Sequence, residues 1–226
     1  MTYTSDVAFS KAVKAIQTER GSRRSYARLE ETRGGFADEI TPEIAAYIAE
    51  RDSAYLATAS AAGQPYVQHR GGPPGFIRVL DPHTLAFADF VGNRQYITTG
   101  NLAENDLAFL FLMNYAEQER IKIWGRARVV TGDHELFEKL ADPRYDARVE
   151  QAIVFEVAAW DGNCPQHIPR LVHAERVERA LGGLRERVDY LERTLRDAGI
   201  SFAPAGGAAA SEREDFDVAT PAAPTV

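Results

Sequence analysis

The pattern of apolar and polar positions separates a strand-rich middle of the chain from helix-rich ends. Six short segments, rich in aromatic and branched side chains, follow one another from Ala54 to Val130. They are "AYLATAS", "QPYVQHR", "GFIRVLD", "TLAFADF", "DLAFLFLMN" and "ERIKIWGRARVV", and the turn-like pieces "AAGQ", "GGPP" and "DPH" separate several of them. A further segment, "QAIVFEVAAW", alternates in the same way. Short strands at this spacing predict an antiparallel sheet or barrel.

Helical signals precede and interrupt these strands. Residues 5–20 are compatible with a helix, and "GSRRSYARLEETRGGF" indicates an irregular arm because glycines stand at both of its ends. In "TPEIAAYIAERDS", Thr41 predicts an N-cap, Pro42 the first helical position, and Ile44 and Ile48 a buried face. Two more short helices are expected at "RQYITTGNLAEN" and "HELFEKLADP".

A long helix is expected from about Ala174. Its apolar residues are spaced 4, 3, 4, 3 and 4 apart, as in a coiled-coil seam: Val177, Leu181, Leu184, Val188, Leu191 and Leu195. Gly182 and Gly183 each weaken this helix by about 1 kcal/mol relative to alanine. The seam must be buried, either against its copy in a second subunit or on the barrel, and we expect it to reinforce a dimer held together elsewhere.

Composition narrows the class of protein. The chain of 226 residues carries a net charge of −7, which argues against non-specific nucleic-acid binding and favours a small-molecule ligand. No apolar run is long enough for a membrane span, and the N-terminus lacks the features of a signal peptide, so a cytoplasmic protein is expected. The single cysteine, Cys164, excludes an internal disulfide, and the five histidines lack metal-ligand spacing, so we expect no metal.

The turn between "FADF" and "YITTGN" carries the first candidate chemistry. Gly92, Asn93 and Arg94 stand where a strand gives way to a helix. A helix start offers unpaired N–H groups and the positive end of the helix dipole, and a guanidinium beside it makes a site for an anion such as phosphate. The alternative is an ordinary turn with a solvated arginine.

The order of these elements resembles the pyridoxamine 5'-phosphate oxidase-like flavoproteins, in particular their flavin-nucleotide-binding branch. The resemblance runs from Ile40 to Trp160 and is most specific in "GNRQ", "NLAEN" and "IKIWGRA". It implies a mainly β (α+β) protein whose centre is an antiparallel split β-barrel that binds FMN, with FMN at the interface of a homodimer. The chain then divides into an N-terminal helix and arm (1–39), the barrel (40–160), a loop and coiled-coil-like helix (161–200) and a disordered tail rich in alanine, glycine, proline and acidic residues (201–226).

The resemblance also implies residues that bind the cofactor. The phosphate would be held from one strand end and from the turn, with further residues facing the flavin or lining the pocket: Gln68, His69, Arg70, Asp89, Asn93, Arg94, Gln95, Arg120, Lys122, Gln166 and His167. The family's oxidases usually carry Ser-Arg-Lys where this chain has Asn-Arg-Gln, so one positive charge is lost, and Arg70 or Lys122 could restore it. From the residues alone, His69 could equally be structural, and Arg120 and Lys122, which share one strand face, could form surface ion pairs.

We expect an FMN-dependent oxidoreductase that moves a hydride or electrons between FMN and a small organic substrate, with NAD(P)H or oxygen as the other partner. The C-terminal Trp- and Arg-containing segment that holds the substrate phosphate in the vitamin-forming oxidases has no counterpart here, so pyridoxamine phosphate is not the expected substrate. The alternatives are a non-catalytic flavin carrier, sensor or scavenger, or a split barrel that binds F420 or haem, in which His69 or His167 would be the candidate haem ligand.

Overall fold

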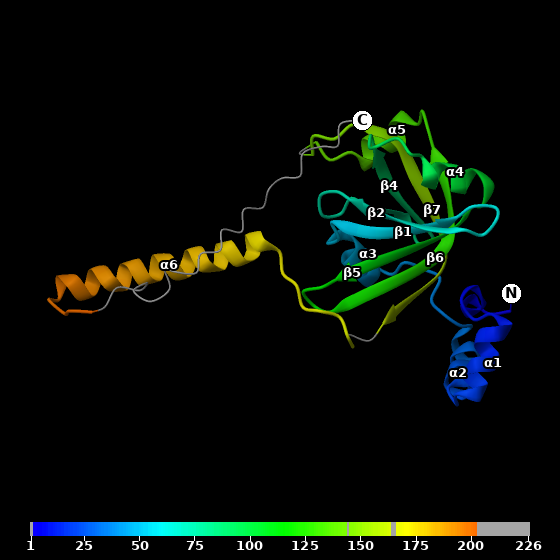
Figure 1. The fold of residues 1–226 in the computed structure, drawn as a ribbon, viewed down its shortest axis with the longest axis horizontal. Helices are drawn as coiled ribbons and strands as arrows, with labels where there is room; N and C mark the ends of the chain where they lie inside the picture. Colours follow the sequence, from blue (N-terminus) through cyan, green and yellow to red (C-terminus); the bar gives the residue numbers. More distant parts are fainter. Residues whose placement is uncertain (1, 144, 164–165, 203–226) are drawn as a thin grey trace. The chain divides into compact units, whose positions relative to one another are not determined.

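The computed structural model describes residues 2–143, 145–163 and 166–202 (Figure 1). The chain forms two compact units, Met1–Leu171 and Val172–Val226. The first contains the N-terminal helices and the β-sheet, and the second contains helix α6 (Ala174–Asp197). Cys164 and all but the first two residues of the expected 201–226 tail lie outside the described residues.

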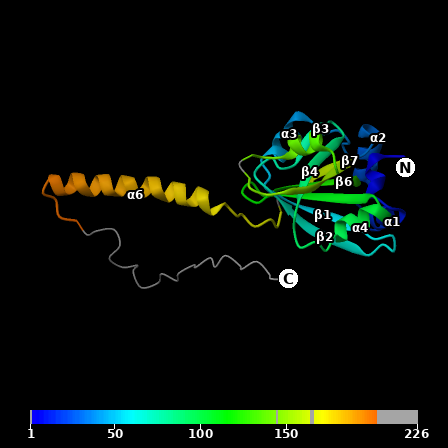
Figure 2. The ribbon, with the colours of Figure 1, turned by 90° about the horizontal axis from the view of Figure 1, so that it is seen from above.

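Seven strands form one antiparallel sheet in the order β2-β1-β5-β6-β7-β4-β3. Figure 2 shows β1 and β2 on one side of this sheet and β3 and β4 on the other. Their bounds are β1 (Ser53–Ala59), β2 (Pro65–Gly71), β3 (Arg78–Asp81), β4 (Thr84–Phe90), β5 (Leu107–Asn114), β6 (Glu119–Val130) and β7 (Val149–Asn163). The expected strands are confirmed, although β3 begins later than "GFIRVLD" indicated. Since β2 and β3 are the two edges of the sheet, the curled sheet is a split barrel that is not strictly closed.

Strand alternation builds the main core. Leu56 of β1, Leu110 of β5, Ile123 of β6 and Phe155 of β7 are all 0% exposed, and their strand neighbours point to the opposite face. Each such side chain contributes about 1.5–3 kcal/mol through burial. Helix α3 (Pro42–Ala49) closes this core with Ile48, which is also fully buried.

Two further helices cover parts of the sheet. Helix α5 (His134–Leu140) places Leu140 against small side chains of β4 and β7, so these two strands are buried on both faces. Helix α4 (Ile97–Glu104) packs near β1 and β2, where Asn101 Nδ2 donates a hydrogen bond of 3.0 Å to Thr58 Oγ1. The expected short helices are therefore confirmed, and Thr41 caps α3 as expected, since its hydroxyl accepts from the Ile44 N–H.

The prediction of an irregular arm after the first helix is wrong, because most of this segment is helical. Residues Thr4–Val7 form a 3-10 turn, Lys11–Glu19 form α1, and Arg23–Arg33 form α2. The glycines lie only outside α2, and Gly34 ends it in the left-handed conformation (φ 78°), which costs glycine nothing. The helix expected over residues 5–20 is present but shorter, because α1 begins only after Ser10, whose hydroxyl accepts a hydrogen bond from the Val13 N–H.

Buried charge holds the N-terminal helices α1 and α2 together, and stacked rings hold the segment after α2 to the barrel. Glu30 is 2% exposed and forms ion pairs with Lys14 and Arg23. Beyond α2, Phe36 stacks on Trp124 of β6 with ring centroids 5.5 Å apart and an angle of 11° between the planes. The N-terminal helices therefore belong to the same packed unit as the sheet.

Helix α6 confirms the long C-terminal helix that the seam predicted, and none of its residues is buried. Within the described residues, no helix combines the length and apolarity needed to cross a bilayer.

Candidate anion-binding site

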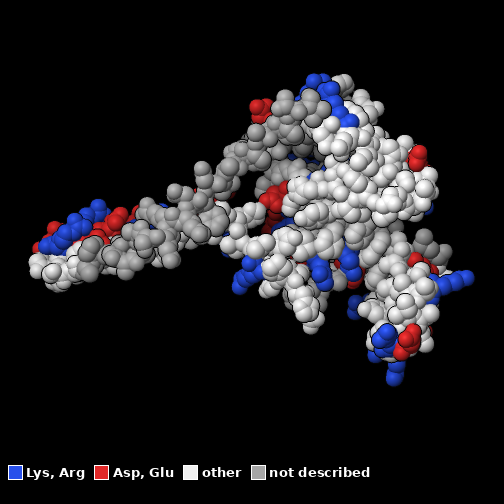
Figure 3. All heavy atoms as spheres, viewed as in Figure 1, with Lys and Arg blue, Asp and Glu red and all other residues white. Residues whose placement is uncertain are grey.

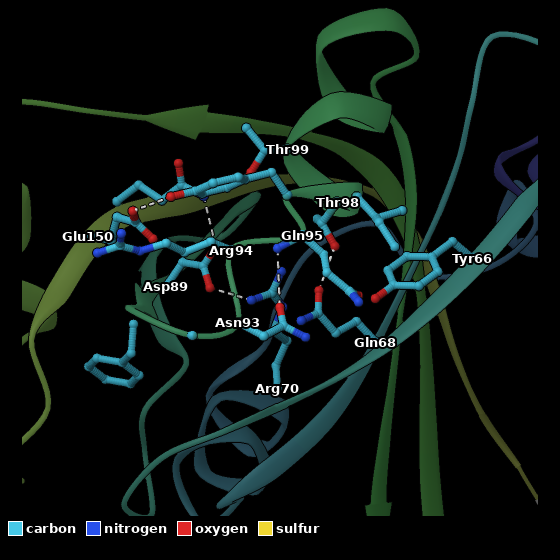
Figure 4. Close-up of a pocket in the computed structure, with 15 residues that line it drawn as sticks. Tyr66, Gln68, Arg70, Asp89, Asn93, Arg94, Gln95, Thr98, Thr99 and Glu150 are labelled. Carbon is cyan, nitrogen blue, oxygen red and sulfur yellow. Dashed lines mark hydrogen bonds and ion pairs between the residues drawn. The ribbon is translucent and has the colours of Figure 1, made fainter. Parts of the chain in front are cut away.

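A small polar cavity that opens to solvent lies where β2, the end of β4, the start of α4 and β7 meet (Figure 4). Four segments distant in sequence supply its walls. They are Tyr66, Gln68 and Arg70 from β2; Asp89 and Phe90 from β4; Gly92 to Thr99 from the turn and the start of α4; and Glu150 and Gln151 from β7. Antiparallel pairing of β4 with β7 places Asp89 directly opposite Gln151.

One side of the cavity is a network built around Arg70. Its guanidinium Nη1 forms an ion pair with Asp89 Oδ1, and the two side chains are only 11% and 13% exposed. Gln151 Nε2 donates to the other carboxylate oxygen of Asp89 at 2.9 Å and lies 2.9 Å from Thr99 Oγ1. The Nε of Arg70 is fully buried and has no hydrogen-bond partner among the described residues. Burying a guanidinium N–H without an acceptor costs free energy, so the Nε–H of Arg70 is a hydrogen-bond donor whose capacity is unused within the described residues.

The other side of the cavity is the turn that carries Arg94. Arg94 and Tyr96 both have positive φ angles, 57° and 52°, which L-residues other than glycine rarely adopt. Asn93 shapes the turn, because its Oδ1 accepts from the Gln95 N–H at 3.2 Å. Backbone strain of this kind costs of order 1–3 kcal/mol per residue and gathers at ligand sites. The exposed Arg94 forms no ion pair with any other part of the described chain.

The hydroxyl of Tyr96 donates to Glu150 Oε1 at 2.8 Å. This hydrogen bond is the main reason why the pKa of Tyr96 is raised above its usual value. Tyr96 thereby ties the turn to β7 and gives the Glu150 carboxylate a donor.

Helix α4 begins beside both arginines. Its N-cap residue is Tyr96, which provides no side-chain hydrogen bond to the helix start. The side chain of Thr98 is buried, and its hydroxyl donates to Gln68 Oε1 at 2.8 Å. Uncapped N–H groups at a helix start, together with two guanidinium groups, suit an oxyanion with several acceptor oxygens.

The charges of the cavity nearly balance. Arg70 and Arg94 face the carboxylates of Asp89 and Glu150, but both carboxylates already accept hydrogen bonds from protein donors. An anion in this cavity would therefore meet Arg94, which has no ion pair within the described residues, beside the side chain of Arg70.

Six of the predicted site residues line this cavity: Gln68, Arg70, Asp89, Asn93, Arg94 and Gln95. His69 does not, because strand alternation turns it to the opposite face of β2, where its ring lies 5.8 Å from that of Tyr55 on β1. Sequence reasoning grouped three consecutive strand residues and overlooked this alternation.

Arg120 and Lys122 share one face of β6, as their spacing indicated, but they line other surfaces. Arg120 lies in a second cavity of about 970 Å³ with Tyr47, Trp160 and several glutamates, and burial raises the pKa of Tyr47 to about 12. Lys122 forms an ion pair with Asp161 at 2.9 Å and lies 5.3 Å from the centre of the Trp124 ring. The surface ion pair considered for Lys122 is thus present.

Gln166 and His167 form an exposed turn after β7, in which His167 has a φ of 63°. Neither residue lines the polar cavity.

Sequence reasoning missed several lining residues. Thr98 and Thr99 stood in "YITTGN", where hydroxyls in a first helical turn were a usable signal. Glu150 and Gln151 could be placed only by knowing that β7 pairs with β4, some sixty residues earlier.

Comparison with known proteins adds a sequence match and several structural likenesses. Residues 40–168 match the family model described as pyridoxamine 5'-phosphate oxidase. A search of curated proteins gave no match.

Solved structures similar to this chain include HupZ of Group A Streptococcus, with 19% identity, a TM-score of 0.46, and coverage of 59% of this chain and 99% of that one. A pyridoxamine 5'-phosphate oxidase homologue from Lactobacillus delbrueckii has 20% identity, a TM-score of 0.42, and coverage of 55% and 95%. An FMN-binding protein from Syntrophomonas wolfei has 12% identity, a TM-score of 0.42, and coverage of 72% and 99%. The sequence match extends over more than half of the chain and coincides with the split barrel. The chain belongs to the pyridoxamine 5'-phosphate oxidase family.

Proposed function

We propose that this protein is a flavoprotein that binds FMN, with the phosphate group of FMN held in the cavity between Arg70 and Arg94. The observation that carries the proposal is the side chain of Arg70, which lines the cavity together with the exposed Arg94 and has a buried Nε without an acceptor among the described residues. A phosphate monoester supplies the acceptor oxygens and negative charge that such donors lack. Membership of the pyridoxamine 5'-phosphate oxidase family supports a flavin as the carrier of that phosphate.

The near balance of charge sets an expectation for how tightly phosphate binds. Where the family's oxidases usually have a lysine, this chain has Gln95, and Asp89 already shares the charge of Arg70. Lys122 does not restore the lost charge, because it pairs with Asp161 on another strand. We therefore expect the phosphate to contribute less to affinity than in a cavity with an additional free cation.

We further propose that the protein acts as a homodimer with FMN at the interface and both chains contributing to the site. Apolar side chains on the outer face of the sheet support this arrangement: Leu107 is 54% exposed, Val67 59% and Tyr55 37%. An apolar hollow of about 600 Å³ lies on the same face, lined by residues that include Ala57, Phe109 and Trp124. Exposed apolar surface of this kind is typical of association sites.

The proposed activity is oxidoreduction of a small organic substrate, with NAD(P)H or oxygen as the other partner. When bound, the flavin supplies the redox chemistry, and the protein supplies binding, orientation and electrostatics. In this chain Arg70, Arg94 and the start of α4 would anchor the phosphate end. Pyridoxamine phosphate is not the proposed substrate, because the chain lacks the C-terminal segment that holds its phosphate in the vitamin-forming oxidases.

The test is to titrate the purified protein with FMN and then follow the bound flavin at 450 nm under anaerobic conditions. NADH or NADPH is expected to bleach the flavin band, and an added electron acceptor is expected to restore it. If neither NADH nor NADPH reduces the bound FMN, the result would favour a non-catalytic flavin carrier or sensor over an oxidoreductase. A protein that takes up F420 or haem but no FMN would keep the fold and overturn the proposed cofactor.

A further inference from the structure

Helix α6 presents an apolar stripe that no other described residue of its own unit, Val172–Val226, buries. Five of its six seam residues are between 39% and 63% exposed: Val177, Leu181, Leu184, Val188 and Leu191. Basic and acidic residues are interspersed in the sequence of the helix, and both kinds are visible beside each other at the end of α6 in Figure 3. We propose that α6 pairs in parallel and in register with α6 of a second copy of this chain, as a two-stranded coiled coil.

The seam fits this geometry. In a heptad register, Leu181, Val188 and Leu195 occupy a positions, and Val177, Leu184 and Leu191 occupy d positions. Leucine at d with a β-branched residue at a, as around Val188, favours two parallel strands. The two glycines, Gly182 and Gly183, fall at b and c and therefore face away from the seam, and a Cβ added at either would meet nothing within 4 Å.

Charges beside the seam select the parallel orientation. Arg187 occupies a g position and Glu192 the following e position. In a parallel, in-register pair these two positions lie opposite each other on different helices, so Arg187 of each copy faces Glu192 of the other. Twofold symmetry produces this attractive pair twice.

The antiparallel alternative brings like charges together. The alignment that pairs all six seam residues sets Leu181 against Leu191 of the other copy. It then places Glu178 opposite Glu192, Arg185 opposite its own copy, and Arg187 opposite its own copy. Such juxtapositions are a recognised means of excluding an orientation. Charge complementarity therefore favours parallel pairing of α6 with α6 of a second copy over antiparallel pairing.

Contacts within one helix are compatible with this pairing. Glu192 and Arg196 form an ion pair, with 3.5 Å between Oε2 and Nη2. The guanidinium of Arg187 lies 5.2 Å from the centre of the Tyr190 ring. An interhelical pair would extend these contacts into a network that includes Arg196, Glu192 and Arg187 of the second copy.

Disulfide trapping tests the orientation directly in the full-length chain, with Cys164→Ser as the background. Leu191→Cys places a thiol at a d position, and Arg193→Cys, two residues further on, places one at the outward f position. Under mild oxidation Leu191→Cys should yield mostly crosslinked dimer, because d-position side chains of parallel helices meet. Arg193→Cys should remain mostly monomeric on a non-reducing gel.

Equal crosslinking by the two variants, or none by Leu191→Cys, would overturn the proposal. In the antiparallel alignment the two Leu191 positions would be about 15 Å apart along the axis, since ten residues rise by ~1.5 Å each. A mixture of Leu191→Cys and Leu181→Cys chains would then crosslink preferentially to each other, which would also contradict the parallel pairing. No flavin is added in this experiment, so its outcome is independent of whether FMN binds.

A charge reversal provides the second measurement. Arg187→Glu should reduce crosslinking of the Leu191→Cys chain at least several-fold, because it sets two glutamates against each other in both pairs. Adding Glu192→Arg to Arg187→Glu should restore crosslinking. Failure of the double reversal to restore it would show that these charges do not face each other.

Discussion

Replacing Arg94 by glutamine isolates the contribution of the turn to phosphate binding. The change removes a positive charge but keeps a polar, hydrogen-bonding side chain, although a shorter one, at an exposed position. Since Arg94 makes no ion pair elsewhere in the described chain, its loss should leave the folded protein unaffected. The effect should therefore appear in the binding of a phosphorylated ligand and nowhere else.

The magnitude follows from the environment of the side chain. A hydrogen bond to a charged group contributes about 1.5–3 kcal/mol. Arg94 is exposed, so solvent screening favours the lower end of this range, about 1.5 kcal/mol. That loss corresponds to a roughly tenfold weaker Kd for FMN.

The assay is quenching of flavin fluorescence, measured with FMN and with riboflavin, which lacks the phosphate. Arg94→Gln should weaken FMN binding about tenfold and leave riboflavin binding unchanged. Arg24→Gln, which removes a charge from the exposed surface of α2, serves as the control and should change neither. If Arg94→Gln weakens both ligands equally, or neither, the turn does not hold a phosphate.

Three other expectations concern stability. Asp89→Ala should lower the free energy of unfolding in urea by about 3 kcal/mol, because it leaves the Arg70 guanidinium buried without its counter-ion. Replacing both Arg70 and Asp89 by leucine should recover most of that loss and still abolish FMN binding. Gly125→Ala should lower the melting temperature strongly, since its Cβ would lie 2.0 Å from the Glu156 carbonyl oxygen, whereas Gly100→Ala in α4 has open space and should stabilise by about 0.5–1 kcal/mol. Tyr47 has a pKa of about 12 in the folded chain against its ordinary 10, so it ionises first in the unfolded chain, and stability should fall between pH 10 and 12. Urea unfolding of Tyr47→Phe should show a shallower fall over that range, and an equal fall would contradict the burial argument.

Much of the fold was accessible from the sequence because its signals are local. Alternation marked the strands, and Thr41 with Pro42 marked the start of α3. The helix α2 is not predicted by the local pattern, because the glycines around it indicate irregular chain, although Gly34 is the left-handed residue that ends this helix. Its stability also depends on a distant contact, the burial of Glu30 against Lys14, which no local pattern reveals.

The candidate site was only partly accessible, for a related reason. The turn with Arg94 and the strand with Arg70 were visible as motifs, but the partners of Arg70 come from the pairing of β4 with β7. Gln151 stands directly opposite Asp89 only after the sheet order is known. His69 could have been separated from Arg70 by strand alternation alone, since adjacent residues of a strand face opposite sides.

The measurement that tests the central claim most directly is an absorbance spectrum of the purified protein after incubation with FMN and gel filtration, followed by mass spectrometry of whatever heat releases. Bands typical of oxidised flavin that remain with the protein, and a released mass equal to that of FMN, are the result we predict. A colourless protein that retains no FMN would contradict a phosphate site formed by Arg70 and Arg94.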